Sequence, residues 1–196
     1  MSPRRRQRVS GVAKVCILGI AAAASRMAFA GSAGVDVFVP AVARAVGQAN
    51  ATFYSTLWIT NINSSAANID VRFHETGVSN TNPQRFFDTL QSGETKKYEN
   101  VVETKFGRAS ASGSLRIVAT LPVLASTRTY DVAPGGNIRD SKGLYFAGIP
   151  VDVAIGRGQS TLVQGVSQGG SEDFRYNFGA LETSGQEATI LATLRD

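Results

Sequence analysis

The feature that most constrains the fold of this chain is a strict alternation of apolar and polar side chains. In the segment 67–75, ANIDVRFHE, apolar residues occupy every second position from Ala67 to Phe73, with polar or charged residues between them. A β-strand places successive side chains on opposite faces, so this pattern predicts a strand with one buried and one solvated face. We therefore expect Ile69 and Val71 to lie in a hydrophobic core.

Similar short runs recur along the chain, separated by clusters of Gly, Asn, Pro and Ser that are typical of turns. One short helix is expected at Val101–Phe106, capped by Asn100 and ended by Gly107. The pattern indicates an all-β protein, an antiparallel Ig-like β-sandwich with this one short helix. Strands are predicted at Val35–Val42, Phe53–Ile62, Ala67–Glu75, Gln84–Leu90, Ser114–Thr120, Val123–Asp131, Leu144–Ile149, Thr161–Ser167, Phe174–Leu181 and Ala188–Arg195.

An internal similarity relates two distant parts of the chain. Residues 53–75 and 174–196 align without a gap, and the apolar positions of the second strand in each copy coincide. The first copy would belong to a β-sandwich domain at 31–158. Residues 159–196 would form a partial second repeat, which is either the start of a second similar sandwich or a terminal hairpin.

The first thirty residues have the organisation of a secretory signal peptide. A basic head that contains Arg4, Arg5, Arg6, Arg8 and Lys14 precedes a short apolar run at 15–24 and a small-x-small site at 28–30. The run is too short to span a bilayer, and no later stretch is long and apolar enough to do so. We expect cleavage before Gly31 and a secreted or periplasmic protein with no membrane span after cleavage.

The charge and cysteine content of the remaining chain exclude several function classes. Residues 1–30 contain six of the 20 Lys and Arg and none of the 15 Asp and Glu, so 14 basic and 15 acidic residues remain. A net charge of −1 argues against nucleic acid as a partner. Cys16, the single cysteine, lies in the same segment, so no disulfide, thiol nucleophile or cysteine metal site is expected. We expect no cofactor.

Several short motifs are spread over residues 37–196. They are the run VPAVA at 39–43, Trp58, the pairs Val101-Val102 and Phe106-Gly107, the strand Leu124–Tyr130 (LASTRTY), and the segment 174–194. In this combination the chain resembles a family of exported bacterial β-sandwich proteins with Ig-like tandem repeats, whose members are largely uncharacterised. The resemblance implies an Ig-like sandwich followed by a second one, and it implies no catalytic residues.

Two aromatic residues are candidates for ligand binding. Tyr54 and Trp58 fall on the face of their predicted strand opposite Leu57 and Ile59. An exposed pair of aromatic rings on a flat sheet can stack on a sugar or anchor a partner protein. Alternatively, another strand or the short helix covers them, since sandwich domains often bury a strand tryptophan.

A hydrolase, or a hydrolase accessory domain, is the alternative from another function class. His74 is the only histidine and lies on the polar face of its predicted strand, so a catalytic triad would have to use it. No Gly-x-Ser-x-Gly motif supplies a nucleophile. A pair of carboxylates could act on glycosides, but the acidic residues are scattered along the chain.

The segment 131–140 offers oxygen ligands for a cation. Asp131, Asn137 and Asp140 are residue types that calcium accepts, although their spacing does not match a calcium-binding Asp-x-Asp-x-Asp-Gly loop. A turn formed by Pro134, Gly135 and Gly136 explains the same residues without a metal.

Taken together, these patterns predict an exported, non-catalytic β-sandwich module with a binding or structural role at the cell envelope or outside the cell. Its partner would be a protein or a carbohydrate. A further alternative is an assembly subunit, in which the incomplete second repeat is completed by a strand from another chain.

Overall fold

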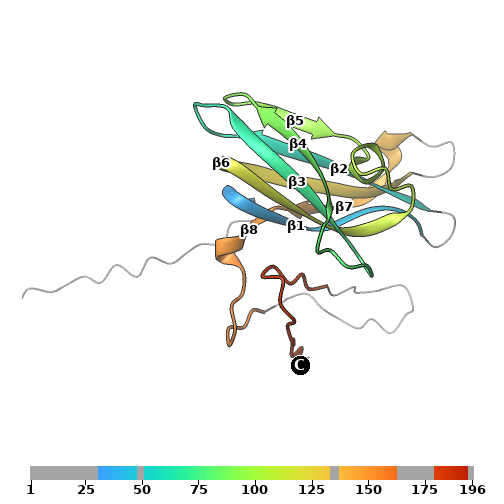
Figure 1. Cartoon of the computed structure of the whole chain (residues 1–196). Helices are drawn as coiled ribbons and strands as arrows, with labels where there is room; N and C mark the ends of the chain where they lie inside the picture. Colours follow the sequence, from blue (N-terminus) through green and yellow to red (C-terminus); the bar gives the residue numbers. More distant parts are fainter. Residues whose placement is uncertain (1–30, 48–50, 133–136, 163–178, 194–196) are drawn as a thin grey trace, which may run out of the picture.

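The computed structural model describes residues 31–47, 51–132, 137–162 and 179–193 (Figure 1). The predicted signal peptide at 1–30 lies outside the described residues. So do most of the strands predicted at Thr161–Ser167 and Phe174–Leu181. No described helix is long and apolar enough to cross a membrane.

The described chain is an antiparallel β-structure with a single turn of α-helix, which confirms the all-β class. Helix α1 (Val101–Thr104) is shorter than predicted, and Gly107 follows it with a positive φ of 66°. Asn100 is at the predicted N-cap position, but its backbone is left-handed and its side chain caps no backbone N–H. The strands are β1 (Gly34–Val46), β2 (Thr52–Asn61), β3 (Ala67–Glu75), β4 (Gln84–Leu90), β5 (Thr95–Tyr98), β6 (Ala111–Val132), β7 (Lys142–Ala147) and β8 (Ile149–Pro150), with short 3-10 turns η2 (Ile138–Asp140) and η3 (Val151–Val153).

Strand β6 is the centre of the fold. It has 22 residues and joins the two strands predicted at Ser114–Thr120 and Val123–Asp131. One edge of β6 pairs with β3 and then with β2, and the other edge pairs with β1 and then with β7. Pro122 lies where the first edge changes partner from β3 to β2, so its missing N–H removes no ladder hydrogen bond. The proline therefore marks a change of partner within one strand.

The eight strands form one sheet that curls strongly. Strands β1, β2 and β6 each pair with the other two, which requires the sheet to bend back on itself. The curl brings β4 and β5, the two ends of the strand order, together through side chains. Asp88 of β4 accepts hydrogen bonds from Lys96 Nζ at 2.6 Å and from Tyr98 Oη at 2.9 Å. Among the described strands there is no separate second sheet.

The inner face of the curl contains the hydrophobic core. The alternation predicted for β3 is confirmed, because Ala67, Ile69, Val71 and Phe73 are all at most 2% exposed. Helix α1 and its C-terminal turn close one end of this core, where the rings of Phe106 and Phe73 lie 5.3 Å apart. Full burial of a side chain such as Phe73 stabilises the fold by roughly 1.5–3 kcal/mol.

The described part of the predicted second repeat contains no strand. Residues 179–193 are irregular, and the strand predicted at Ala188–Arg195 is wrong over residues 188–193. Its apolar residues Ile190 and Leu191 are exposed, the latter by 90%. An alternating pattern forms a strand only where a neighbouring strand pairs with it, and these residues have no paired neighbour in the described structure.

Candidate binding site

Trp58 faces outward from the curled sheet because of its position in β2. Leu57 and Ile59, on either side of it, are fully buried in the core, so the pleat directs the Trp58 ring to the opposite face. The side chain is partly buried there. It lies beside Ser126 of β6 in register, and Ser126 in turn lies beside Ala147 of β7.

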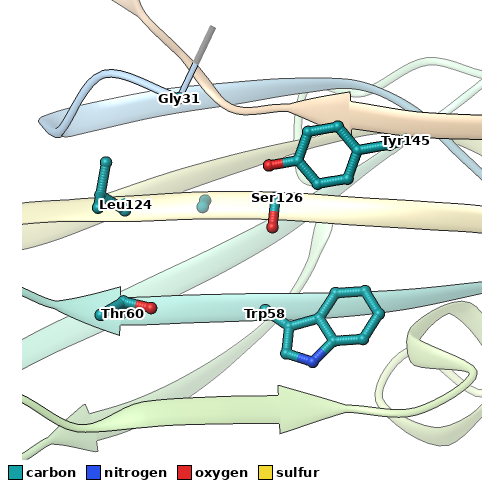
Figure 2. Close-up of a pocket in the computed structure, with 7 residues that line it drawn as sticks. Gly31, Trp58, Thr60, Leu124, Ser126 and Tyr145 are labelled. Carbon is teal, nitrogen blue, oxygen red and sulfur yellow. The ribbon is translucent and has the colours of Figure 1, made fainter.

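An open pocket of about 270 Å³ lies on this outer face, across β2, β6 and β7. Figure 2 shows the rings of Trp58 and Tyr145 on either side of Ser126. Thr60 adds a second hydroxyl, which also bonds to the Thr95 hydroxyl at 2.9 Å, and the rest of the lining is Leu124, Ala125 and Gly31. The pocket therefore combines two aromatic rings with hydroxyl groups that can donate and accept hydrogen bonds.

Tyr145 is a site residue that the sequence analysis missed. It lies in β7 opposite Arg128, and it is 65% exposed. Its neighbour Phe146 packs against the core, which turns Tyr145 to the outer face. That alternation was the available signal, but nothing in the sequence places β7 two strands away from Trp58.

Tyr54, the second predicted ligand-binding residue, does not line the pocket. Its ring stacks on Tyr130 of β6, with centroids 6.1 Å apart and an angle of 27° between the planes. The guanidinium of Arg44 lies 4.6 Å from the centre of the Tyr54 ring. Tyr54 is thus engaged with neighbouring side chains, whereas Trp58 contributes to the open pocket.

Two cations lie beside the pocket, and one of them is paired with a carboxylate. Lys97 of β5 lies opposite Trp58 and forms an ion pair with Glu99. Arg128 lies opposite Tyr145, stacks over the Tyr130 ring at 5.1 Å and donates a hydrogen bond to the carbonyl of Ser141. Within the described residues, Arg128 forms no ion pair, so its charge is not neutralised by a carboxylate there.

His74 lies on the outer face of β3, opposite Ser114 of β6. Its Nε2 atom is buried and has no hydrogen-bond partner. Burial lowers the pKa of His74 below its usual value, and the nearby charges of Arg116 and Arg72 lower it further. A triad histidine bonds to the nucleophile through one ring nitrogen and to a carboxylate through the other, and Nε2 of His74 bonds to neither group.

The charged groups around His74 form ion pairs with one another. Arg116 binds both oxygens of Asp36, at 2.9 and 2.7 Å, and Arg72 binds one oxygen of Asp70 at the same two distances. Such two-point guanidinium–carboxylate contacts are stronger than hydrogen bonds between neutral groups. Both aspartates are therefore paired with an arginine. Of their four carboxylate oxygens, only Oδ1 of Asp70 is buried without a hydrogen-bond partner.

Asp88 lines a second depression on the surface, and its carboxylate is hydrogen-bonded to Lys96 and Tyr98. This depression, around Phe87, includes Asp88. Burial alone would raise the pKa of Asp88, but hydrogen bonds from Lys96, the Thr89 backbone and Tyr98 outweigh burial and lower the pKa. Burial, followed by the contact with Asp88, raises the pKa of Tyr98. Asp88 thus stays ionised and joins β4 to β5.

The predicted calcium ligands are only partly described. Asp131 is near the end of β6, opposite Lys142 of β7, and Asp140 ends the turn η2. Residues 133–136 between them lie outside the described residues, as does the side chain of Arg139. In the described ranges, no three His, Cys, Asp or Glu side chains gather in a way that could hold a metal ion. The set Asp131, Asn137 and Asp140 stays a prediction.

Comparisons with known proteins assign no family to the chain. No protein-family model matches it, and no curated protein matches it. A distant similarity exists to the crystal structure of Thermotoga maritima 1070. The two share 13% identity with a TM-score of 0.45, over 59% of this chain and 92% of that chain. A similarity at that level supports no inference about activity.

Proposed function

We propose that this protein is an exported, non-catalytic β-module that binds a saccharide at the cell envelope or outside the cell. The observation that supports this proposal is the open pocket in which Trp58 and Tyr145 flank the hydroxyl of Ser126. Export rests on the organisation of residues 1–30 and is part of the proposal.

The chemistry of the pocket matches that of a sugar ring. One face of a pyranose presents C–H groups, which pack on an aromatic ring, and its edge presents hydroxyls, which can bond to Ser126 and Thr60. The volume of about 270 Å³ lies just below the roughly 300–1,000 Å³ of pockets for drug-sized ligands. A pocket of this size fits one sugar unit of a longer chain that continues over the open surface.

The experiment uses the protein secreted with its own first 30 residues, purified, and titrated calorimetrically with neutral and acidic oligosaccharides. Trp58→Ala should weaken binding by about tenfold or more, because a stacked indole is worth at least about 1.4 kcal/mol. Phe87→Ala is the matched control, since Phe87 is also an exposed aromatic residue (66%) but lies at the other depression.

Two results would overturn the proposal. One is that no oligosaccharide of the panel binds at millimolar concentration. The other is that Trp58→Ala and Phe87→Ala bind as tightly as the unchanged protein while their melting temperatures stay the same. Recovery of the protein only from the cytoplasm with residues 1–30 intact would overturn the export part alone.

Neither alternative function gains support from a specific contact. A hydrolase using His74 lacks the hydrogen bonds that would activate a nucleophile, and the pocket at Trp58 has no carboxylate in its lining. Strand addition at Ala188–Arg195 lacks a strand in the described residues 188–193 to receive a partner.

A further inference from the structure

We infer that the amino terminus created by cleavage before Gly31 becomes part of the Trp58 pocket and selects a saccharide that carries a carboxylate. This inference rests on the proposed function and adds the class of ligand. Its structural basis is that Gly31, the first residue after the predicted cleavage site, itself lines the pocket with Trp58 and Tyr145.

Gly31 lies three residues before β1, and the start of that strand brings it close to β6. Gly34, three residues later, pairs with Val123 of β6, and the next residue of β6, Leu124, lines the pocket. The first residues of β1 are therefore held at the edge of β6 that leads to β7. Figure 2 shows Gly31 on the same side of Ser126 as Tyr145.

Cleavage changes the chemistry of this rim. Hydrolysis of the Ala30–Gly31 peptide bond by a signal peptidase consumes one water, leaves a carboxylate on Ala30 and leaves an ammonium group on Gly31. A neutral peptide N–H is thereby replaced by a positive charge with three hydrogen-bond donors. An ammonium near the faces of aromatic rings is also favoured by their negative potential.

Two cations lie beside the rim without lining the pocket, and only Arg128 lacks a carboxylate partner within the described residues. Arg128, opposite Tyr145, and Lys97, opposite Trp58, are the neighbouring cations, and Glu99 pairs with Lys97. The pocket lining contains no acidic side chain to neutralise a new ammonium group. A carboxylate on a sugar stacked at Trp58 would supply the counter-charge, with a charge-assisted hydrogen bond to Gly31.

The amino group can be observed selectively. Trp58 is the only tryptophan, so tryptophan fluorescence reports this pocket alone. The new α-amino group has an ordinary pKa of about 7.7–8.0. Cys16 is removed with the first 30 residues, and the pKa of His74 is lowered below its usual 6.5, so neither residue titrates in that range. Tyr145 is the only titratable side chain in the lining of the pocket.

The test compares two chains released from a fusion protein by proteolysis, one beginning at Gly31 and the other at Phe29. The second chain moves the amine two residues away and leaves a neutral peptide group at Gly31. Each is titrated with a galacturonic acid trisaccharide and with the neutral galactose trisaccharide of the same linkage. Fluorescence of each chain without ligand is also followed from pH 6.5 to 9.

The Gly31 chain should bind the acidic trisaccharide about tenfold more tightly than the Phe29 chain does, and both chains should bind the neutral trisaccharide equally. Without ligand, Trp58 fluorescence should change with a midpoint near pH 8 in the Gly31 chain alone. An equal preference in both chains, or no fluorescence change in either, would overturn the role of the amino group. If neutral sugar still binds and Trp58→Ala abolishes it, the proposed function stands without this inference. Absence of binding by both trisaccharides overturns both.

Discussion

The two halves of β6 share one strand but present very different outer faces. In the first half, Arg116 lies between Arg72 of β3 and Phe38 of β1, and its charge is matched by Asp36. In the second half, Ser126 lies between Trp58 of β2 and β7, and the aromatic surface stays open. The inner faces of both halves belong to one hydrophobic core.

The two outer faces of β6 therefore suit different roles, one in stabilising the fold and the other in binding a ligand. Arg85, Arg72 and Arg116 are aligned across β4, β3 and β6, an arrangement in which directly opposed like charges repel. Asp70 and Asp36 relieve that repulsion by direct ion pairs, so the three arginines of this half are paired with carboxylates within the molecule. The aromatic half leaves the rings of Trp58 and Tyr145 and the hydroxyl of Ser126 open at the pocket, which is the state expected of a ligand surface.

The largest loss of stability should come from a substitution that places a charge in the hydrophobic core shared by both halves of β6. Val71→Asp puts a charge without a partner at a position that is 0% exposed, at a cost comparable to the whole stability of a domain, about 5–15 kcal/mol. We expect no cooperative melting transition in circular dichroism. Asn68→Asp, on the exposed face of the same strand, should change stability by less than about 1 kcal/mol. A Val71→Asp protein with unchanged melting would contradict the assigned face.

A smaller effect should distinguish the two outer faces. Arg116→Ala breaks the two hydrogen bonds to Asp36 and the contact over the Phe38 ring, so we expect a loss of about 1–3 kcal/mol in urea unfolding. Tyr145→Ala removes a mostly exposed ring and should cost less than about 0.5 kcal/mol. Equal losses for the two variants would show that the aromatic face is also structural.

The smallest effect should be a dependence of stability on pH near neutrality. The pKa of His74 is lower in the folded state than its usual 6.5, so the unfolded state binds a proton first as the pH falls. The free energy of unfolding should therefore decrease between pH 7.5 and 5.5. The His74→Gln variant should lose part of this decrease in urea midpoints. An identical decrease in the variant would show that His74 titrates alike in both states.

Most strands could be predicted because apolar residues at every second position are visible within a short stretch of sequence. The bounds of β3 and β4 match the expectation to the residue. Strand β5 was missed, since its four residues, TKKY, include two lysines and are too few to show a pattern. The curl was not predictable either. The curl depends on which edges of β6 pair with β1 and β2. The alternation of side chains predicts which face of a strand is buried, but it does not predict which strands pair with each other.

The site was predictable only in part, for a related reason. Trp58 was identified because the alternation in β2 is local, and Tyr54 was grouped with it on the same grounds. In the structure, Tyr54 stacks on Tyr130, whereas Tyr145 and Gly31 line the pocket together with Trp58. Those partners come from β6, β7 and the residues before β1, and their approach follows from strand order rather than from any local sequence pattern.

The length of β6 has a consequence for the order of folding. Strands β1, β2 and β3 each depend on pairing with residues between Ala111 and Val132, in contacts that span up to about ninety positions of sequence. In a chain synthesised from its amino end, β1 and β3 therefore lack their partner until residues 111–123 have been made, and β2 lacks its partner until Val132 has been made. During that interval its apolar strand faces stay exposed, and such exposed faces and unpaired edges are prone to aggregate.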